Sequence, residues 1–410
     1  MYAKAITRKK RGEVANFSLS LQIDSITHHK MMFFLLLIPI FIAVLIDLVA
    51  YRHKVIARRA LLLLLAIDTL PLWILLVGVL CDNTPTVMRL TMWAIWLWIA
   101  LTLPRFLYAL FAAIHLRFVG IATSIAALCV LVWGVVVGRK DLQVNEVEIC
   151  SEHLPKAFDG YRIAHFSDLH LGTLVNTRHE VGQLVERLNQ LQPDMVCFTG
   201  DLVNIRHSEL DAQATRLLQG IQAPVLSVLG NHDVGSYIRD TLRLPREVSH
   251  QRLIKQQQQM GWLLLQDSTI YLHRGADSLS VTGLTFDPSL RHDRHSTILP
   301  LTGGEKAYQG VPDSLYNITL VHLPQLWEQI VSLGYGHLTL AGHTHAMQLK
   351  LRFGEGRGWS PAGWMYDRWS GRYDLNGHTL YINDGIGYVG YPMRIGARPE
   401  ITLYTLKRCE

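Results

Sequence analysis

A long apolar stretch, from residue 32 to residue 138, constrains this chain more than any other feature of its sequence. A helix needs about 20 mostly apolar residues to cross a bilayer. Four segments reach that length: Met32–Tyr51, Ala60–Cys81, Thr86–Ile114 and Val119–Gly138. Buried helices of soluble domains rarely stay apolar for so long. We therefore predict about four transmembrane helices, with three as the alternative because Pro104 and Arg105 interrupt the third segment.

The basic residues around these segments bear on how the chain is oriented in a membrane. The first 31 residues are basic at residues 8–11, and no signal-peptide cleavage site is evident after the first segment, so we expect that segment to remain in the chain. The loop after the first segment holds four basic residues, whereas the loop after the second holds one. By the positive-inside rule, the region beyond the fourth segment then faces the extracytoplasmic side. The basic tail and Arg139–Lys140 favour the opposite orientation.

Charged residues and cysteines carry less information about the fold. The net charge is +6 and the pI is about 9.0, but the basic residues concentrate in the tail and loops, which indicates membrane anchoring rather than nucleic-acid binding. Three of the five cysteines lie beyond the apolar stretch and show neither disulfide nor zinc spacing: Cys150, Cys197 and Cys409. Charges inside apolar segments are costly, so we expect three such residues to pair in helix packing: Asp47, Asp68 and Arg105.

Beyond residue 140, short hydrophobic stretches alternate with segments of helical spacing. The pattern predicts strands within 142–150, 158–170, 195–201 and 224–233, and helices within 179–194 and 213–222. The same alternation returns in 315–324, 325–334 and 336–345. This order predicts a layered α/β domain in which ligands gather at the carboxyl ends of the strands.

Five of these strands end abruptly in residues that can bind a metal. They are Asp168, His170, Asp201, Asn231, His232, His322, His343 and His345. Side chains two residues apart in an extended segment project to one side, so residues 168 and 170, and likewise 343 and 345, are expected to face one point. Imidazoles mixed with carboxylates suit Mn, Fe or Zn better than Ca or Mg. One such residue alone is as easily a helix cap or a core histidine, but five junctions together favour a metal site.

The blocks at these strand ends are "SDLH", "TGD", "LGNHD", "LVHLP" and "AGHTH". They resemble, in the same order, those of the calcineurin-like metallophosphoesterase superfamily, over roughly residues 145–405. Two longer stretches, "GYRIAHFSDLHLG" and "GIGYVGYPMRIGARPEITLYTL", resemble a membrane-tethered bacterial branch, some members of which act on UDP-diacylglucosamine or on cell-envelope phosphodiesters. The resemblance implies an α/β fold in which a two-sheet β-sandwich, flanked by helices, holds two metals at its strand ends. We accordingly expect a basic tail (1–31), an α-helical transmembrane region (32–138), a linker with a first strand (139–160) and a metallophosphoesterase catalytic domain (161–410).

The resemblance also implies a role for each candidate residue. The first metal would be bound by Asp168, His170 and His345, and the second by Asn231, His322 and His343, with Asp201 bridging both. The catalytic candidates are Asp201 and His232, and the substrate-binding candidates are Asn231, His232 and Arg394. One departure concerns His232: Asn204 stands where many relatives carry an acidic partner for this histidine.

Together these features predict a membrane-anchored phosphohydrolase of the bacterial inner membrane, with several spans. It would cleave a phosphodiester or pyrophosphate bond of a lipid-linked or cell-envelope substrate, through attack by a hydroxide that bridges two divalent ions, Mn or alternatively Fe or Zn. A phosphomonoesterase or nucleotide phosphatase on the same site is the alternative, and an inactive membrane scaffold is a further one. An aromatic-rich segment predicts a lip that receives a lipid head group, with a packed hairpin as the alternative: Trp359, Trp364, Tyr366, Trp369 and Tyr373.

Overall fold

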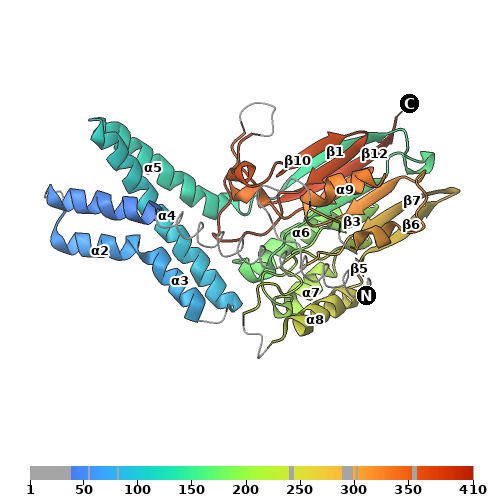
Figure 1. Ribbon diagram of the computed structural model, residues 1–410, viewed down its shortest axis with the longest axis horizontal. Coiled ribbons are helices and arrows are strands. Elements are labelled where there is room, and N and C mark those ends of the chain that lie inside the picture. The colour runs from blue at the N-terminus through green and yellow to red at the C-terminus, as the bar shows by residue number, and fades with distance from the viewer. Residues whose placement is uncertain are drawn as a thin grey trace, which may run out of the picture. The chain divides into compact units, whose positions relative to one another are not determined.

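The computed structural model describes residues 38–53, 56–80, 83–239, 244–288, 299–301, 303–352 and 358–409 (Figure 1). The chain divides into two compact units, one of Met1–Leu75 with Trp98–Ala127 and the other of Leu76–Leu97 with Leu128–Glu410. The predicted basic tail and the start of the first predicted transmembrane segment lie outside the described residues.

Helices account for the apolar stretch. Residues 38–52 are helical, and they are followed by α2 (Arg58–Asp68), α3 (Leu70–Leu80), α4 (Pro85–Ala113) and α5 (Arg117–Trp133), which a short π-helical turn extends to Gly138. The second predicted segment is broken at Thr69, because Pro71 has no N–H and its ring would clash with the carbonyl of residue 67 in a continuous helix. Among the described residues, Pro85–Ala113 and Arg117–Gly138 are each long and apolar enough to cross a membrane. The count of four spans stays a prediction.

The ionisable residues of the apolar stretch pair as predicted. Arg105 in α4 donates to Asp47 Oδ2 at 2.6 Å and also to Asp68. Both carboxylates are buried, with exposed fractions of 4% for Asp47 and 0% for Asp68. Because an unpaired charge is costly in an apolar environment, this pairing stabilises the packing of three helical segments within the first unit.

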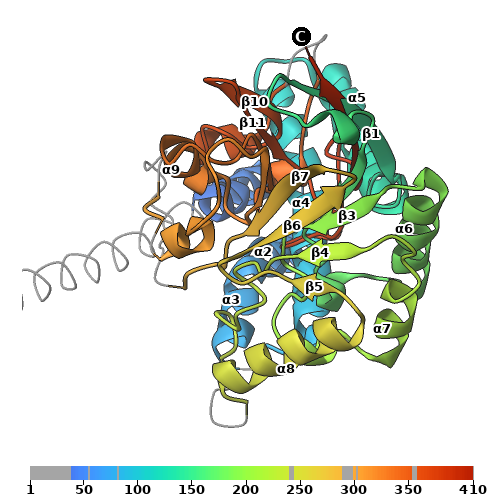
Figure 2. The same ribbon diagram turned by 90° about the vertical axis from the view of Figure 1, so that its right-hand side faces the viewer.

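Two six-stranded sheets form the framework of the second unit (Figures 1 and 2). The first has the order β1-β12-β2-β3-β4-β5 and the second the order β10-β11-β9-β8-β7-β6. The first sheet is built from β1 (Gln143–Ser151), β2 (Arg162–Phe166), β3 (Met195–Phe198), β4 (Val225–Ser227), β5 (Leu263–Leu264) and β12 (Glu400–Arg408). The second is built from β6 (Ser268–Arg274), β7 (Asp277–Gly283), β8 (Asn317–Leu320), β9 (Leu338–Ala341), β10 (Gly371–Leu375) and β11 (His378–Ile382). The predicted two-sheet α/β fold is confirmed.

Apolar side chains fill the space between the sheets and cover their outer faces. Ile163 of β2 and Ile318 of β8 belong to one buried cluster, which joins the inner faces of the two sheets. The outer face of the first sheet shares a second cluster with three helices: α6 (Thr177–Leu191), α7 (Ala212–Leu218) and α8 (Arg246–Gln259). On the second sheet, Trp327 of α9 (Trp327–Ser332) lies in a third cluster with Leu380 of β11 (Figure 2). Strands covered on both faces account for the near-continuous apolar runs in the sequence.

A disulfide joins the first and last strands of the second unit. β1 and β12 are parallel neighbours in which Ser151 pairs with Arg408, and this register places Cys150 beside Cys409 with their Cα atoms 5.7 Å apart. The expectation drawn from cysteine spacing was therefore wrong. The two cysteines are 259 residues apart, and their contact depends on a strand pairing that spacing does not reveal.

Candidate metal centre

The candidate ligands follow the carboxyl ends of five parallel strands. Residues 168 and 170 follow β2, residue 201 follows β3, and residues 231 and 232 follow β4, three strands that are neighbours in the first sheet. Residue 322 follows β8, and residues 343 and 345 follow β9, its neighbour in the second sheet. The strand ends of both sheets thus deliver the candidate ligands to one region.

The backbone at these ligands is left-handed rather than extended. Asp168, His170, Asp201, His343 and His345 have φ angles of 55°, 46°, 61°, 78° and 51°. Asp168 and His170 converge as predicted, whereas His343 and His345 lie in different clusters. The predicted cause, alternation in an extended segment, was wrong. Left-handed conformations cost about 1–3 kcal/mol each in residues other than glycine and concentrate at functional sites.

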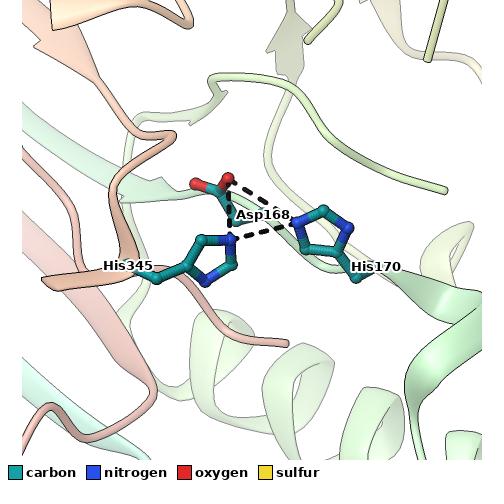
Figure 3. A group of neighbouring side chains, drawn as sticks. All are labelled: Asp168, His170 and His345. Carbon is teal, nitrogen blue, oxygen red and sulfur yellow. Dashed lines mark hydrogen bonds and ion pairs between the residues drawn. The ribbon is translucent and has the colours of Figure 1, made fainter. Parts of the chain in front are cut away.

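The first ligand cluster consists of Asp168, His170 and His345 (Figure 3). The Nε2 atoms of His170 and His345 lie 3.1 Å apart, and Asp168 Oδ1 lies 3.3 Å from His345 Nε2. All three side chains are buried. The backbone N–H of His343 donates to Asp168 Oδ2 at 3.0 Å, so the turn that carries the second cluster also orients this carboxylate.

The second cluster brings together Asn231, His322 and His343. Asn231 Oδ1 lies 2.9 Å from His322 Nε2 and 3.0 Å from His343 Nδ1. His322 Nδ1 donates to the carbonyl of Thr199 at 2.8 Å, which turns Nε2 of the same ring towards Asn231. A hydrogen bond from the remote ring nitrogen is the usual way in which a protein orients a ligating histidine.

Asp201 lies between the two clusters. Its Oδ2 is 3.6 Å from His170 Nε2 and 3.2 Å from His322 Nε2. The close approach requires a glycine at position 230, where a Cβ atom would collide with the Asp201 carboxylate. This carboxylate therefore occupies the position that a ligand shared by two ions would need.

Electrostatics keep both carboxylates ionised. Burial would raise the pKa of Asp168, but the neighbouring imidazoles, led by His345, outweigh it and hold the pKa well below its usual range. The same opposition between burial and the His322 imidazole leaves the pKa of Asp201 below its usual value. Burial lowers the pKa of His170, which favours its neutral imidazole. At His322 burial also favours the neutral form, but the carboxylates, led by Asp201, outweigh it and raise the pKa to about 9, so a metal ion must displace a proton from this ring. Ionised carboxylates and neutral imidazoles are the forms that bind metals.

The donor set fits divalent transition-metal ions. Three overlapping groups each bring ligand atoms within 4.8 Å of one another: Asp168, His170 and His345; His170, Asp201 and His232; Asp201, His322 and His343. Carboxylate oxygens and imidazole nitrogens that face one another this closely are stabilised by a cation between them. Imidazole and carboxylate donors together suit Mn, Fe or Zn.

His232 shares a group with His170 and Asp201, and its ring centroid lies 4.7 Å from that of His170. Its Nδ1 donates to the carbonyl of Asn204 at 2.5 Å, and its Nε2 lies 4.0 Å from Asp201 Oδ2. Its side chain is 13% exposed, whereas those of His170 and His322 are 0% and 1% exposed. The backbone carbonyl of Asn204 thus stands where the missing acidic partner was expected.

Two buried carboxylates that are not candidate ligands hold the loops in place. Asp233 accepts from the backbone N–H groups of Asp201 at 2.8 Å and Val203 at 3.1 Å, and so ties the loop after β3 to the loop after β4. Glu209 accepts from four backbone N–H groups, including that of Asn204. Sequence reasoning missed Glu209, because its role depends on a turn that no motif marks.

Arg394 does not lie where a substrate could reach it. It is 0% exposed, and it donates to the carbonyls of Asp384, Gly387 and Ala397. A remaining N–H lies 3.2 Å from His345 Nδ1. The guanidinium donates to three backbone carbonyls and is fully buried beside His345, so it is not placed to bind a phosphate as predicted.

Comparisons with known proteins agree with this geometry. The family model for the calcineurin-like phosphoesterases matches residues 161–347. The uncharacterized metallophosphoesterase YkuE of Bacillus subtilis is 30% identical over 274 residues, which cover 65% of this chain and 86% of that protein. A transmembrane protein with a metallophosphoesterase domain from Danio rerio is 31% identical over 294 residues, covering 68% of this chain and 60% of that protein. The UDP-2,3-diacylglucosamine pyrophosphatase LpxG of Chlamydia muridarum is 31% identical over 123 residues, which are 28% of this chain and 36% of that protein.

The matched range contains every candidate metal ligand, from Asp168 to His345. Two apolar helices of spanning length and the similarity to a relative named as a transmembrane protein indicate that the chain is associated with a membrane. The ligand set and the family match together make the chain a metal-dependent hydrolase of phosphoester bonds. This chain belongs to the calcineurin-like phosphoesterase family.

Proposed function

We propose that this protein hydrolyses a phosphodiester or pyrophosphate bond in a lipid-linked or cell-envelope substrate, with two divalent ions at the strand ends. The observation that carries the proposal is the position of Asp201, within 3.6 Å of His170 on one side and 3.2 Å of His322 on the other. A shared carboxylate of this kind is what a pair of ions requires.

In the proposed reaction, the seven ligands hold the two ions and His232 acts on the leaving oxygen. When bound, the two ions supply an activated water and offset the charge that develops on the phosphoryl oxygens. Neutral imidazoles leave the ligand set with few negative charges, so the loaded site still attracts an anionic substrate. His232 donates from Nδ1 to the Asn204 carbonyl, so a neutral ring has no hydrogen on Nε2. In its imidazolium form the ring would carry an Nε2–H and would donate that proton to the leaving oxygen. Mn is the proposed ion, with Fe and Zn as alternatives.

An aromatic lip supports a lipid-linked substrate. Of the five aromatic residues predicted for it, Trp369 and Tyr373 are buried, whereas Trp359 and Trp364 are 40% and 76% exposed. The two exposed indoles contact each other with ring centroids 5.6 Å apart. Tyr366, two residues after Trp364, contacts the centre: its hydroxyl is 3.4 Å from His343 Nε2. We define Trp359, Trp364 and Tyr366 as the aromatic lip, a segment that combines exposed indoles with a contact to a candidate metal ligand.

A series of backbone hydrogen bonds connects the lip to the last apolar helix. Trp359 exchanges bonds with Leu351 at 2.8 Å, and the neighbouring Lys350 donates to the carbonyl of Ile395 at 2.8 Å. Arg394, the residue before Ile395, donates its N–H to the carbonyl of Gly134 at 3.1 Å. Amphipathic aromatic side chains favour the membrane–water interface. Because backbone hydrogen bonds connect the lip to the end of a helix of spanning length, the lip is suited to receive a lipid head group from the bilayer. The partial similarity to a UDP-2,3-diacylglucosamine pyrophosphatase supports the same substrate class.

The disulfide supports an extracytoplasmic catalytic domain on a multi-pass protein of the inner membrane. Disulfides persist in oxidising compartments and are rare in the cytosol. The bond between Cys150 and Cys409 agrees with the orientation that the loop charges favour.

The proposal is tested on the full chain in detergent, stripped of metal with a chelator and reloaded with Mn²⁺. We expect Mn²⁺-dependent hydrolysis of bis-p-nitrophenyl phosphate, with Asp201→Asn lowering the rate at least about 100-fold, the upper end of the cost of disturbing a metal site's supporting residues. Asp313→Asn, a change at an exposed aspartate, is the matched control and should keep full activity. Metal-independent hydrolysis, or full activity in Asp201→Asn, would reject the proposal. Faster turnover of p-nitrophenyl phosphate than of the diester would favour the phosphomonoesterase alternative.

A further inference from the structure

Tyr237 lies in the loop after β4, against two of the candidate site residues. Its ring stacks on the imidazole of His232, with ring centroids 4.2 Å apart and planes inclined by 24°. Its hydroxyl oxygen lies 2.9 Å from Asn231 Nδ2. One aromatic side chain therefore contacts both the proposed proton donor and a proposed ligand of the second metal.

The contact with Asn231 decides which end of the amide faces the centre. Only Oδ1 of an asparagine can bind a cation, whereas Nδ2 can only donate hydrogen bonds. Because Nδ2 donates to the Tyr237 hydroxyl, Oδ1 is directed at His322 and His343, from which it lies 2.9 and 3.0 Å. A flipped amide would instead aim two N–H groups at the ion.

The loop that carries Tyr237 is itself held by a residue from the apolar half of the chain. Asn83, two residues before α4, donates from Nδ2 to the carbonyl of Tyr237. Its own backbone carbonyl accepts from Arg206 Nη2, in the loop after β3, at 3.2 Å. Asn83 is 6% exposed, so these bonds are shielded from water. A residue between the second and third predicted spans thus joins the loops after β3 and β4.

We propose that Tyr237 is a positioning residue that orients Asn231 as a ligand of the second metal, and that Asn83 couples this arrangement to the segment between two spans. The inference rests on the proposed function, since it takes Asn231 as a ligand. It gives the membrane region a role beyond anchoring, because the affinity of the second site then depends on a residue that enters from that region.

The test measures Mn²⁺ binding rather than activity alone. The metal-free full chain is titrated in detergent, bound Mn²⁺ is counted by elemental analysis after dialysis, and electron paramagnetic resonance separates single ions from spin-coupled pairs. Tyr237→Phe keeps the stacked ring and removes the acceptor for Asn231. We expect the first ion to bind as in the wild type and the second to bind about 10–100-fold more weakly, the usual cost of removing a residue that orients a ligand. Excess Mn²⁺ should restore both the coupled signal and the activity, which a general folding defect would not allow.

Two further variants sharpen the result. Tyr271→Phe removes an equally exposed phenol, 42% against 43% for Tyr237, in β6 away from the centre, and should bind both ions normally. Asn83→Asp keeps an acceptor for Arg206 but cannot donate to the Tyr237 carbonyl. Like Tyr237→Phe, it should lower the affinity for the second Mn²⁺ ion.

The outcomes separate this inference from the proposed function. A wild type that binds two ions and a Tyr237→Phe variant that binds the second equally tightly would overturn the inference and leave the proposed function standing. Normal binding in Asn83→Asp would overturn the coupling to the membrane region. A wild type that binds fewer than two ions would overturn the proposed function and this inference with it.

Discussion

Five of the seven proposed ligands hold left-handed backbone conformations, which cost about 1–3 kcal/mol each in residues other than glycine. The surrounding hydrogen bonds offset this cost. Asp233 accepts from backbone N–H groups of two ligand loops. Glu209 accepts from three N–H groups in the turn at Asn204 and from that of Gly172 in the loop after β2. The ligand side chains are therefore placed by these buried contacts as much as by the strands that precede them.

His232 is proposed as a proton donor and the seven ligands as metal-binding residues, so a substitution at His232 should affect the rate without affecting metal binding. His232→Asn removes the ring that faces the leaving oxygen while leaving the seven proposed ligands in place. We expect kcat to fall by about 10²–10⁴-fold, the usual contribution of a general acid or base. Elemental analysis should still find two ions per chain. Loss of an ion in this variant would show instead that His232 is a ligand.

How far the site could be predicted also depends on particular residues. Asp168, Asp201, Asn231 and the histidines were predicted because each follows a short apolar run directly in the sequence. Their left-handed backbone was not, since nothing in the residue types marks it. The contact between Asn83 and Tyr237 spans 154 positions and joins two loops, so no local pattern reveals it.

At the scale of elements, β1 and β12, the first and last strands of the second unit, pair with each other at one edge of the first sheet. β12 also pairs antiparallel with β2, the strand that leads into Asp168. The C-terminal strand thus supports the strand that delivers the first ligands. The individual strands could be predicted from hydrophobic runs, but this long-range pairing and the disulfide it allows could not.

The disulfide gives a prediction at this scale. In membranes from intact cells, Cys150 and Cys409 should resist alkylation by a maleimide until a reductant is added, because the bond forms only in an oxidising compartment. In the purified chain, Cys409→Ser should lower the free energy of unfolding by about 2–5 kcal/mol. Cys129→Ser, at a free and exposed cysteine, is the control. Full alkylation of both cysteines without reductant would place the domain in a reducing compartment.

At the scale of the whole molecule, apolar helices and a hydrolytic centre occur in one chain. Two contacts link the apolar stretch to residues around the centre, and the residues on both sides of each contact lie within the second unit. Arg394 donates its backbone N–H to the carbonyl of Gly134 in the last apolar helix, and its guanidinium lies 3.2 Å from His345 Nδ1. Asn83, just before α4, donates from its side chain to the carbonyl of Tyr237, whose own side chain contacts Asn231 and His232. Two residues of the apolar stretch, Gly134 and Asn83, therefore bond to residues that contact the candidate site.

The aromatic lip provides a prediction about the substrate. Trp364→Ser removes the most exposed indole of the lip, and we expect it to raise KM for a micellar lipid pyrophosphate about ten-fold, equivalent to about 1.4 kcal/mol. The rate on water-soluble bis-p-nitrophenyl phosphate should stay unchanged, as should both rates in Tyr271→Ser. An equal loss on both substrates would assign Trp364 to folding rather than to lipid binding.

The central claim is that side chains from five strand ends bind two ions around Asp201. Anomalous X-ray scattering from a crystal of the Mn²⁺-loaded chain tests it most directly. We predict two peaks about 3.5–4 Å apart, one beside Asp168, His170 and His345 and the other beside Asn231, His322 and His343, with Asp201 contacting both. A single peak, or peaks away from Asp201, would contradict the account.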